Sequence, residues 1–322
     1  MHKIIKSPRV TTTLIAALTL FASKEANCQD TLWRHFQDGR AELAGYQLTA
    51  PRYGQLRRGE VVLISVTEPF SRSRRVKVDG AHPGDPDRVT VMKLNQLQRF
   101  LTGVYPYQLM TSVFIGPRAS GEGLMTYKTS FSSQEWCGIL YEEALFTEEA
   151  ATLEVRSYFD GERGERSLRG VRGSEDGLWV SARFAAARYL DRRSSGEEPA
   201  RAAALALLGG ERVRMLGRSR ARRLEHQRAA THILSFSLEP LAEPLELPAG
   251  RHRALRISWE GGAEGGCALD VERAPPHRLL QWRCASGEAA QRTGSFRSAY
   301  WRESSLGDER LRERLRLPGW GG

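Results

Sequence analysis

Short runs of alternating apolar and polar residues, separated by turn residues, dominate this chain of 322 residues. Between residues 41 and 169, glycine or proline interrupts these runs about every 8–12 positions. Such spacing is typical of antiparallel strands joined by short turns, and not of alternating strand–helix units. We therefore predict an all-β fold, with a curved antiparallel sheet or open half-barrel and a few short helices.

The start of the chain has a different character. Lys3, Lys6 and Arg9 precede a mostly apolar run over residues 11–22, which is too short to span a bilayer. This pattern predicts a signal peptide over residues 1–28. The protein is then exported, with a periplasmic or outer-membrane-associated location. Residues 29–322 are long enough to form a single large β domain with a sizeable core.

Cys28 offers an alternative to simple cleavage. A lipid anchor at this cysteine would place the protein on a membrane, but Glu25 and Asn27 fit the lipoprotein motif poorly. Ala26 and Cys28 supply the small residues that a signal peptidase recognises. We favour cleavage without lipidation.

The chain is basic, with a formal net charge of +10. This charge attracts anionic partners such as phospholipid, and export makes nucleic acid an unexpected one. An Arg/Ala-rich stretch at about residues 191–230 predicts a helical strap within the β domain. Within it, a basic patch for an anionic ligand would consist of Arg218, Arg220, Arg222 and Arg223. A solvated surface is the commoner role for such a run.

Three alternating runs near the end of the chain cover residues 253–259, 267–273 and 278–284. If residues 274–277 form a four-residue loop, Cys267 lies directly opposite Cys284. Directly opposed cysteines can form a disulfide, and an oxidising compartment would preserve it. Free thiols are the second interpretation. A zinc site is the third, because zinc needs two further ligands at suitable spacing.

Cys137 lies within the run SFSSQEWCGILYEE, residues 130–143. A nucleophilic thiol needs a base and a lowered pKa, whereas the neighbouring carboxylate of Glu135 would hinder ionisation. The apolar residues around it predict a buried, inert thiol in a strand. An exported hydrolase built around Glu135, Cys137 and a distant histidine remains as an alternative.

An aromatic and methionine-rich run covers residues 104–114. It could line a hydrophobic cavity, although ordinary sheet core is the commoner role. The residues that we predict to contact a ligand are Tyr105, Tyr107, Met110, Phe114 and Trp136. No phosphate-binding loop, dinucleotide fingerprint, serine nucleophile elbow or zinc-protease motif occurs in the sequence. We predict no catalytic residues, no cofactor and no metal.

Five segments carry a resemblance: residues 41–71, 93–114, 132–138, 275–282 and 297–301. They resemble a poorly characterised family of exported bacterial proteins, some of which carry the label "septum formation inhibitor Maf". The Ser7-Pro8-Arg9-Val10 sequence lacks the second arginine of the Maf motif, so we do not carry over that activity. The strand pattern is also similar to periplasmic half-barrel proteins, among them lipoprotein carriers that hold an acyl chain.

These observations favour a non-catalytic protein of the cell envelope that binds a hydrophobic or amphiphilic ligand in the concave face of its sheet. A lipid or amphiphile is the expected partner, and another envelope protein or a membrane surface is an alternative. The rival functions are the exported hydrolase described above and a structural or protein-interaction module.

Overall fold

The computed structural model describes residues 32–80, 84–119 and 123–318. The predicted signal peptide, including Cys28, lies outside these residues. Within them, we find no helix whose length and apolar character would let it span a bilayer.

The larger sheet is antiparallel and contains fourteen strands within the described residues. In spatial order they are β8 (Gly164–Arg169), β7 (Ala150–Ser157), β6 (Gly138–Phe146), β5 (Leu124–Glu135), β4 (Tyr105–Pro117), β3 (Arg88–Thr102), β2 (Gln55–Ser71), β1 (Ala41–Arg52), β16 (Ala289–Ser298), β15 (Leu279–Cys284), β14 (Gly266–Glu272), β13 (Ala254–Glu260), β10 (Thr231–Pro240) and β9 (Arg212–Leu216). A small second sheet pairs β11 (Leu245–Leu247) with β12 (Gly250–His252). The predicted all-β fold is confirmed.

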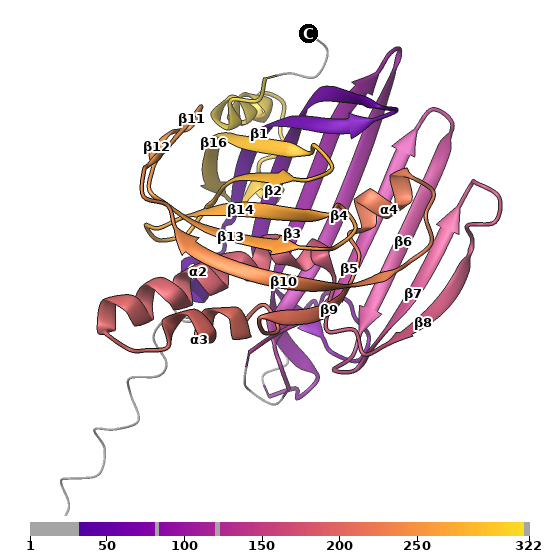
Figure 1. Cartoon of the computed structure of the whole chain (residues 1–322). Coiled ribbons are helices and arrows are strands. Elements are labelled where there is room, and N and C mark those ends of the chain that lie inside the picture. Colours follow the sequence, from indigo (N-terminus) through magenta and orange to yellow (C-terminus); the bar gives the residue numbers. More distant parts are fainter. Residues whose placement is uncertain (1–31, 81–83, 120–122, 319–322) are drawn as a thin grey trace, which may run out of the picture.

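The first eight strands form an uninterrupted meander, because each pairs with the next one in sequence. Three of the turns between them are short: Arg52 pairs with Gln55, Thr102 with Tyr105, and Glu135 with Gly138, which leaves two residues in each of these turns. Tyr53 and Gly54 both have positive φ, 54° and 70°, as a two-residue hairpin turn with the right twist requires. These three turns and the β7–β8 turn therefore lie at one end of the sheet (Figure 1).

The sheet curves until its two edge strands approach each other, but it does not close. The segment that follows β8 runs beside β9 instead of forming a full strand. The Leu216 N–H donates to Gly173 O at 2.9 Å, and Arg172 N–H donates to Arg214 O at 3.2 Å. Ser174 and Leu216 form an isolated parallel bridge. The segment thus occupies the hydrogen-bonding edge of β9, which would otherwise be open to another strand.

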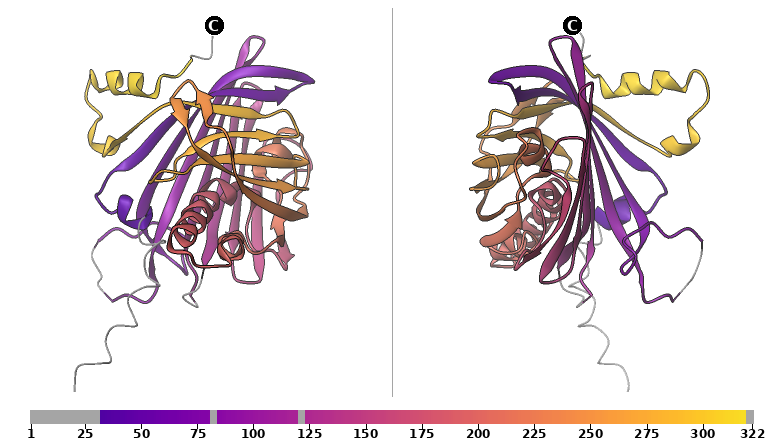
Figure 2. Two further views of the ribbon diagram at one scale, coloured as in Figure 1. Left: turned by 60° about the vertical axis from the view of Figure 1, so that its left-hand side comes forward. Right: turned by 90° about the vertical axis from the view of Figure 1, so that its right-hand side faces the viewer.

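In the part of the chain that the structure describes, the helical elements are short apart from one, and the first is a helical turn at residues 32–35. The others are η1 (Glu175–Gly177), α2 (Leu178–Ser195), α3 (Ala200–Ala206), α4 (Ser219–Leu224), η2 (Tyr300–Arg302) and η3 (Asp308–Leu315). Helix α2 lies on the concave side of the sheet, between its two halves (Figures 1 and 2). It ends at Gly196, whose φ of 71° suits the left-handed conformation that glycine adopts readily.

Helix α2 fills the space in which we predicted a ligand. Its residues from Leu178 to Ala187 are buried, and the apolar ones up to Ala186 belong to the same hydrophobic cluster as the inward-facing strand residues. Trp179 packs edge-to-face on Trp282 with ring centroids 5.9 Å apart. Arg183 bonds the buried carboxylate of Glu42 with two hydrogen bonds, of 2.9 and 3.2 Å. A ligand in the concave face would have to displace this packed helix.

The Arg/Ala-rich stretch is more varied than a strap. Residues 191–230 contain the end of α2, the short helix α3, the edge strand β9, and α4. The helical region also starts earlier than expected, at Leu178, within a segment that the sequence pattern did not mark. A helix buried on nearly all sides lacks the polar stripe that identifies a surface helix.

The C-terminal segment, residues 299–318, lies on the outer side of the sheet, away from α2 (Figure 2). It packs on a second apolar cluster in which Leu43, Val62 and Phe296 come from β1, β2 and β16. It contains the 3₁₀ helix η3. Leu311 and Leu315 pack on this cluster, whereas Leu306 is 98% exposed.

Candidate functional site

Helix α4 contacts β4 and β5 at the end of the sheet that carries the two-residue turns. We call this end the turn end. Arg52, the last residue of β1, donates from Nη1 to the Leu224 carbonyl at 2.5 Å. From Nη2 it donates to the Tyr107 hydroxyl at 3.1 Å. A single buried guanidinium therefore joins the end of α4 to two strands.

The predicted basic patch does not lie on the surface. Arg218, Arg220, Arg222 and Arg223 are only 1–4% exposed, so they form neither an open patch nor a solvated face. The physical reason is that distant segments supply a buried carboxylate for each of them, from strand β6 and from the β13–β14 and β15–β16 loops. A paired guanidinium tolerates burial that an unpaired one does not.

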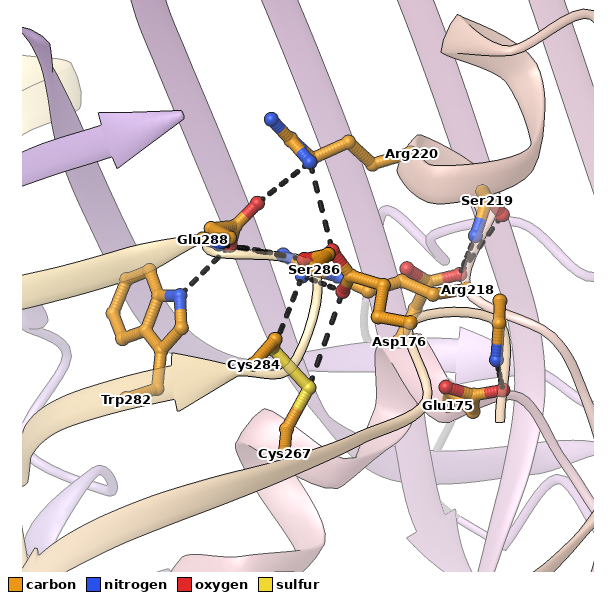
Figure 3. Close-up of polar contacts among 12 residues, drawn as sticks. Glu175, Asp176, Arg218, Ser219, Arg220, Cys267, Trp282, Cys284, Ser286 and Glu288 are labelled. Carbon is orange, nitrogen blue, oxygen red and sulfur yellow. Dashed lines mark hydrogen bonds and ion pairs between the residues drawn. A yellow bond between two sulfur atoms is a disulfide. The ribbon is translucent and has the colours of Figure 1, made fainter. Parts of the chain in front are cut away.

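Arg218 lies at the centre of this cluster (Figure 3). Its Nη1 pairs with Glu264, and its Nη2 donates to Glu288 Oε1 at 2.8 Å. The same oxygen of Glu288 accepts from Trp282 Nε1 at 2.8 Å, while Arg220 Nη1 lies 2.8 Å from Glu288 Oε2. Burial alone would raise the pKa of Glu288, but Arg218 and Arg220 outweigh it and hold the pKa at about 2.

Arg222 and Arg223 share a second carboxylate. Arg222 binds Glu142 with two hydrogen bonds, of 2.6 and 3.1 Å, and Arg223 Nε lies 3.2 Å from Glu142 Oε2. The hydroxyl oxygen of Ser219 also lies 3.1 Å from Glu142 Oε1. Because Glu142 comes from β6, this group ties α4 to the first half of the sheet, and Arg218 ties it to the second half.

Two further acids lie just before α2. Asp176 accepts from the backbone N–H of Ser219 at 3.0 Å and from its hydroxyl at 2.8 Å. Glu175 accepts from Ala263 N–H at 2.9 Å, while its other oxygen is buried without a hydrogen-bond partner among the residues described. Burial raises the pKa of Glu175 to about 7, despite the Ala263 bond that lowers it. These groups together form what we call the arginine cluster. Its members are Glu142, Glu175, Asp176, Arg218, Ser219, Arg220, Arg222, Arg223, Glu264 and Glu288.

The disulfide prediction is confirmed: Cys267 and Cys284 are bonded and pair directly in the sheet. The register was expected to be continuous from the loop, but it shifts by one residue between Asp270 and Val271. A bulge thus restores the expected register at the cysteines. Glu264 lies beside the two sulfur atoms, and the three groups are close enough to hold a metal. Since both thiols are consumed in the disulfide, they supply no thiolate for one.

The prediction of a buried thiol at Cys137 is wrong. Cys137 and Trp136 form the two-residue turn between β5 and β6, and both are exposed. The apolar neighbours suggested burial, yet only Phe131 and Leu140 among them face the core. A two-residue turn projects its side chains into solvent whatever the flanking strands bury.

The surroundings of Cys137 do not activate it. A hydrogen bond to the Glu135 carboxylate and its negative charge raise the pKa of the thiol, as the sequence suggested. His226 lines the same small pocket, of about 90 Å³, but its Nδ1 faces Glu162 at 2.5 Å. A nucleophilic thiol needs a lowered pKa, so this arrangement gives the hydrolase alternative no support.

The predicted ligand-binding residues do not line one cavity. Tyr105 contacts the ring of the exposed Trp136, with centroids 6.3 Å apart, at the turn end. Tyr107 is buried and stacks on Phe100 at 5.2 Å. Phe114 stacks on Phe70 instead, with ring centroids 5.3 Å apart. Because strand residues alternate between faces, Tyr105 and Tyr107 lie on one face of β4, and Met110 and Phe114 lie on the other.

An apolar groove of about 350 Å³ lies elsewhere, between the outer face of the sheet and the C-terminal segment. Its apolar lining consists of Leu43, Val62, Ile64, Leu97, Phe296, Tyr300, Leu311 and Leu315. Charged residues surround this lining: Glu60, Arg99, Glu303, Asp308, Glu309 and Arg312. Apolar walls with a few polar groups, at this volume, are typical of small-molecule sites. No local sequence pattern marks this groove, because its walls come from segments far apart in the chain.

Two glycines allow the backbone of the C-terminal segment to pack closely on the sheet beside this groove. Gly45 and Gly294 pair across β1 and β16, and a Cβ on either one would collide with the backbone of Arg314 or Leu315. The Thr293 hydroxyl donates to the Leu315 carbonyl at 2.6 Å. At the edge of the groove, Arg312 lies 3.8 Å from Glu60. The segment is therefore fixed at its end and spans the groove.

No family model matches the chain, and no curated protein matches it in sequence. Among solved structures it is similar to a crystal structure titled as a beta-barrel-like protein of a domain of unknown function, DUF1849, from Brucella abortus. The two share 8% sequence identity with a TM-score of 0.42, over 80% of this chain and 98% of that chain. Membership of the exported family suggested by the sequence stays a prediction.

Proposed function

We propose that the protein is an exported, non-catalytic protein of the cell envelope that binds an amphiphile in the groove under the C-terminal segment. The observation that carries the proposal is the groove itself, with apolar walls and a volume of about 350 Å³. The proposal keeps the ligand class expected from the sequence but moves the site from the concave to the outer face. Helix α2 is the reason for the move, since it occupies the concave side.

The charges around the groove indicate the head group. The groove is lined by acidic and basic residues. The acidic ones are Glu60, Glu303, Asp308 and Glu309, and the basic ones are Arg99 and Arg312. Charges of both signs suit a zwitterionic head group, whose phosphate and amine would each find a partner. The apolar lining would cover the acyl chain. A purely anionic head group would meet more carboxylates than guanidinium groups.

The test begins with the protein isolated from its native envelope and denatured for mass spectrometry of the extracted lipids. We expect a stoichiometric amphiphile in the unmodified protein and its loss in Leu97→Glu. Leu97 is half-buried in the groove wall, so a charge there can enter the groove without disrupting the core. The matched control is Ile233→Glu on β10, which is half-exposed and outside the groove lining.

Thermal unfolding of both variants shows whether each still folds. The same amphiphile in both folded variants, or none in the unmodified protein, would contradict the proposal.

A further inference from the structure

Exposed apolar side chains gather at the turn end of the sheet. Among the described residues, eleven large hydrophobic side chains are exposed, and six of them lie on or beside the four turns there. We call these six the apolar rim: Tyr53, Leu56, Val104, Trp136, Ile139 and Tyr158. Val104 is 81% exposed, Trp136 72% and Tyr158 74%. Turns normally carry glycine, proline or small polar residues, so this composition is not explained by the fold.

The rim is continuous from turn to turn. The Tyr105 hydroxyl donates to the Tyr53 hydroxyl at 3.3 Å, which joins the β1–β2 and β3–β4 turns. The ring of Tyr105 contacts Trp136 on the β5–β6 turn. A Cβ on Gly138 would touch the ring of Tyr158 at 2.7 Å, so Tyr158 lies directly over the β5–β6 hairpin. Four successive hairpins thus present one connected apolar edge.

Two arginines lie beside this edge on the outer face. Arg58 on β2 pairs with Thr49, Thr49 with Ala289, and Ala289 with Arg283, so the four residues form one row across four strands. Both guanidinium groups line a polar hollow of about 540 Å³. Both arginines are exposed, and neither forms an ion pair with a carboxylate in the part of the chain that the structure describes.

The spacing of the two features fits a membrane surface. Arg58 follows Leu56 by two residues on the same face of β2, about 7 Å along the strand. Interfacial proteins bury apolar side chains roughly 5–10 Å into the boundary between head groups and acyl chains, and basic residues meet the phosphates above them. Tyr and Trp are the side chains that suit this boundary, because one end of each is apolar and the other polar.

We propose that the apolar rim inserts into an anionic phospholipid surface while Arg58 and Arg283 bind its phosphates. A bilayer fits these residues better than a protein does, because the rim is an edge of separate turns and not a flat face. The excess of basic over acidic residues in the chain also draws the protein to an anionic surface. This proposal does not depend on the groove being occupied.

The experiment measures co-sedimentation of the full chain with phosphatidylcholine vesicles, prepared with and without phosphatidylglycerol. We expect binding that is stronger with phosphatidylglycerol and weakens with salt. The rim variant combines Val104→Ser with Trp136→Ser and should weaken binding about tenfold or more, because two exposed apolar side chains no longer enter the bilayer. The charge variant combines Arg58→Gln with Arg283→Gln and should lose the preference for phosphatidylglycerol.

The matched control combines Ile233→Ser with Trp301→Ser, which removes two half-exposed apolar side chains elsewhere. It should bind like the unmodified protein. Every protein carries the same residues 1–28, so a difference between variants reports the rim. Unchanged binding by the folded rim variant would overturn the proposal, as would loss of binding by the control. Failure of the groove test with intact vesicle binding would refute the proposed function alone.

Discussion

The arginine cluster and the apolar rim lie at the same end of the molecule and invert the usual distribution of residues. Arg218 and Arg222 are each 1% exposed, whereas Trp136 and Val104 extend into solvent. The difference shows that burial here depends on whether a charged side chain has an ion-pair partner and on where a residue lies in the backbone, and not on residue type. Distant carboxylates allow the arginines to be buried, and two-residue turns force the apolar residues outward.

The largest effect should come from the shared carboxylate of the arginine cluster. Glu142→Gln removes the charge that Arg222 and Arg223 both face, so Arg222 stays buried without a carboxylate and Arg223 keeps only the more distant Glu162, at 4.0 Å. We expect a loss of about 4 kcal/mol in the free energy of unfolding, measured by urea denaturation. Glu143→Gln is the matched control on the same strand. Its pair with Lys128 is partly exposed, so its loss should stay below about 1 kcal/mol.

The cysteines allow a second comparison between buried and exposed groups, because Cys267 and Cys284 form a buried disulfide and Cys137 is an exposed thiol. Replacing Cys267 and Cys284 together by alanine should cost about 3 kcal/mol, because the bond closes a loop with a sequence separation of 17. Cys137→Ala on the exposed turn should change the free energy of unfolding by less than about 0.5 kcal/mol. Thermal unfolding measures the loss of stability in each variant. Equal losses in the double variant and in Cys137→Ala would contradict this prediction.

Glu175 sharpens the comparison, because it is the member of the arginine cluster that keeps a buried oxygen without a partner. Burial raises its pKa from 4.5 to about 7, so the folded protein favours the protonated form. Its contribution to stability is complete below pH 4.5 and is lost as the pH rises through about 7, by at most roughly 3 kcal/mol.

Glu175→Gln should therefore flatten this part of the dependence of the unfolding free energy on pH, measured by denaturation at a series of pH values. A variant whose profile still falls between pH 4.5 and 7 as in the unmodified protein would assign the effect to another group.

The smallest effect concerns the reactivity of the exposed thiol. Since Glu135 raises the pKa of Cys137, its alkylation by iodoacetamide at pH 8 should be slower than that of an unperturbed cysteine. Glu135→Gln should accelerate it about two- to fivefold, as the thiolate fraction grows. Alkylation followed by mass spectrometry gives both rates. A slower reaction in Glu135→Gln would mean that another group controls the thiol.

The fold could be predicted because its signals are local. Alternation and turn spacing lie within single hairpins, and the pairing of Cys267 with Cys284 needed only one loop length. The same alternation could have separated Tyr107 from Met110, had it been applied to the predicted cavity. Position within a turn, and not the apolar neighbours, decides the exposure of Cys137.

The candidate sites could not be predicted, because they depend on long-range pairing. Glu142 lies 80 residues before Arg222 in sequence, and nothing local to either residue marks the ion pair. Helix α2 escaped notice since the burial of all its residues from Leu178 to Ala187 removes the periodic polar face from this part. The groove requires β2 and the C-terminal segment to meet, which the pairing of β1 with β16 brings about.

That pairing also has a consequence for how the chain is made. β1 bonds to β2 on one side, but its other neighbour, β16, is the last strand of the sheet to be synthesised. A chain emerging from its N-terminus can therefore build the meander β1–β8 from neighbouring contacts, while the outer edge of β1 stays open until nearly the whole sequence has appeared. During this interval the half-built sheet offers a template for strands of other molecules. Chaperones that hold the nascent chain extended would protect it in that window.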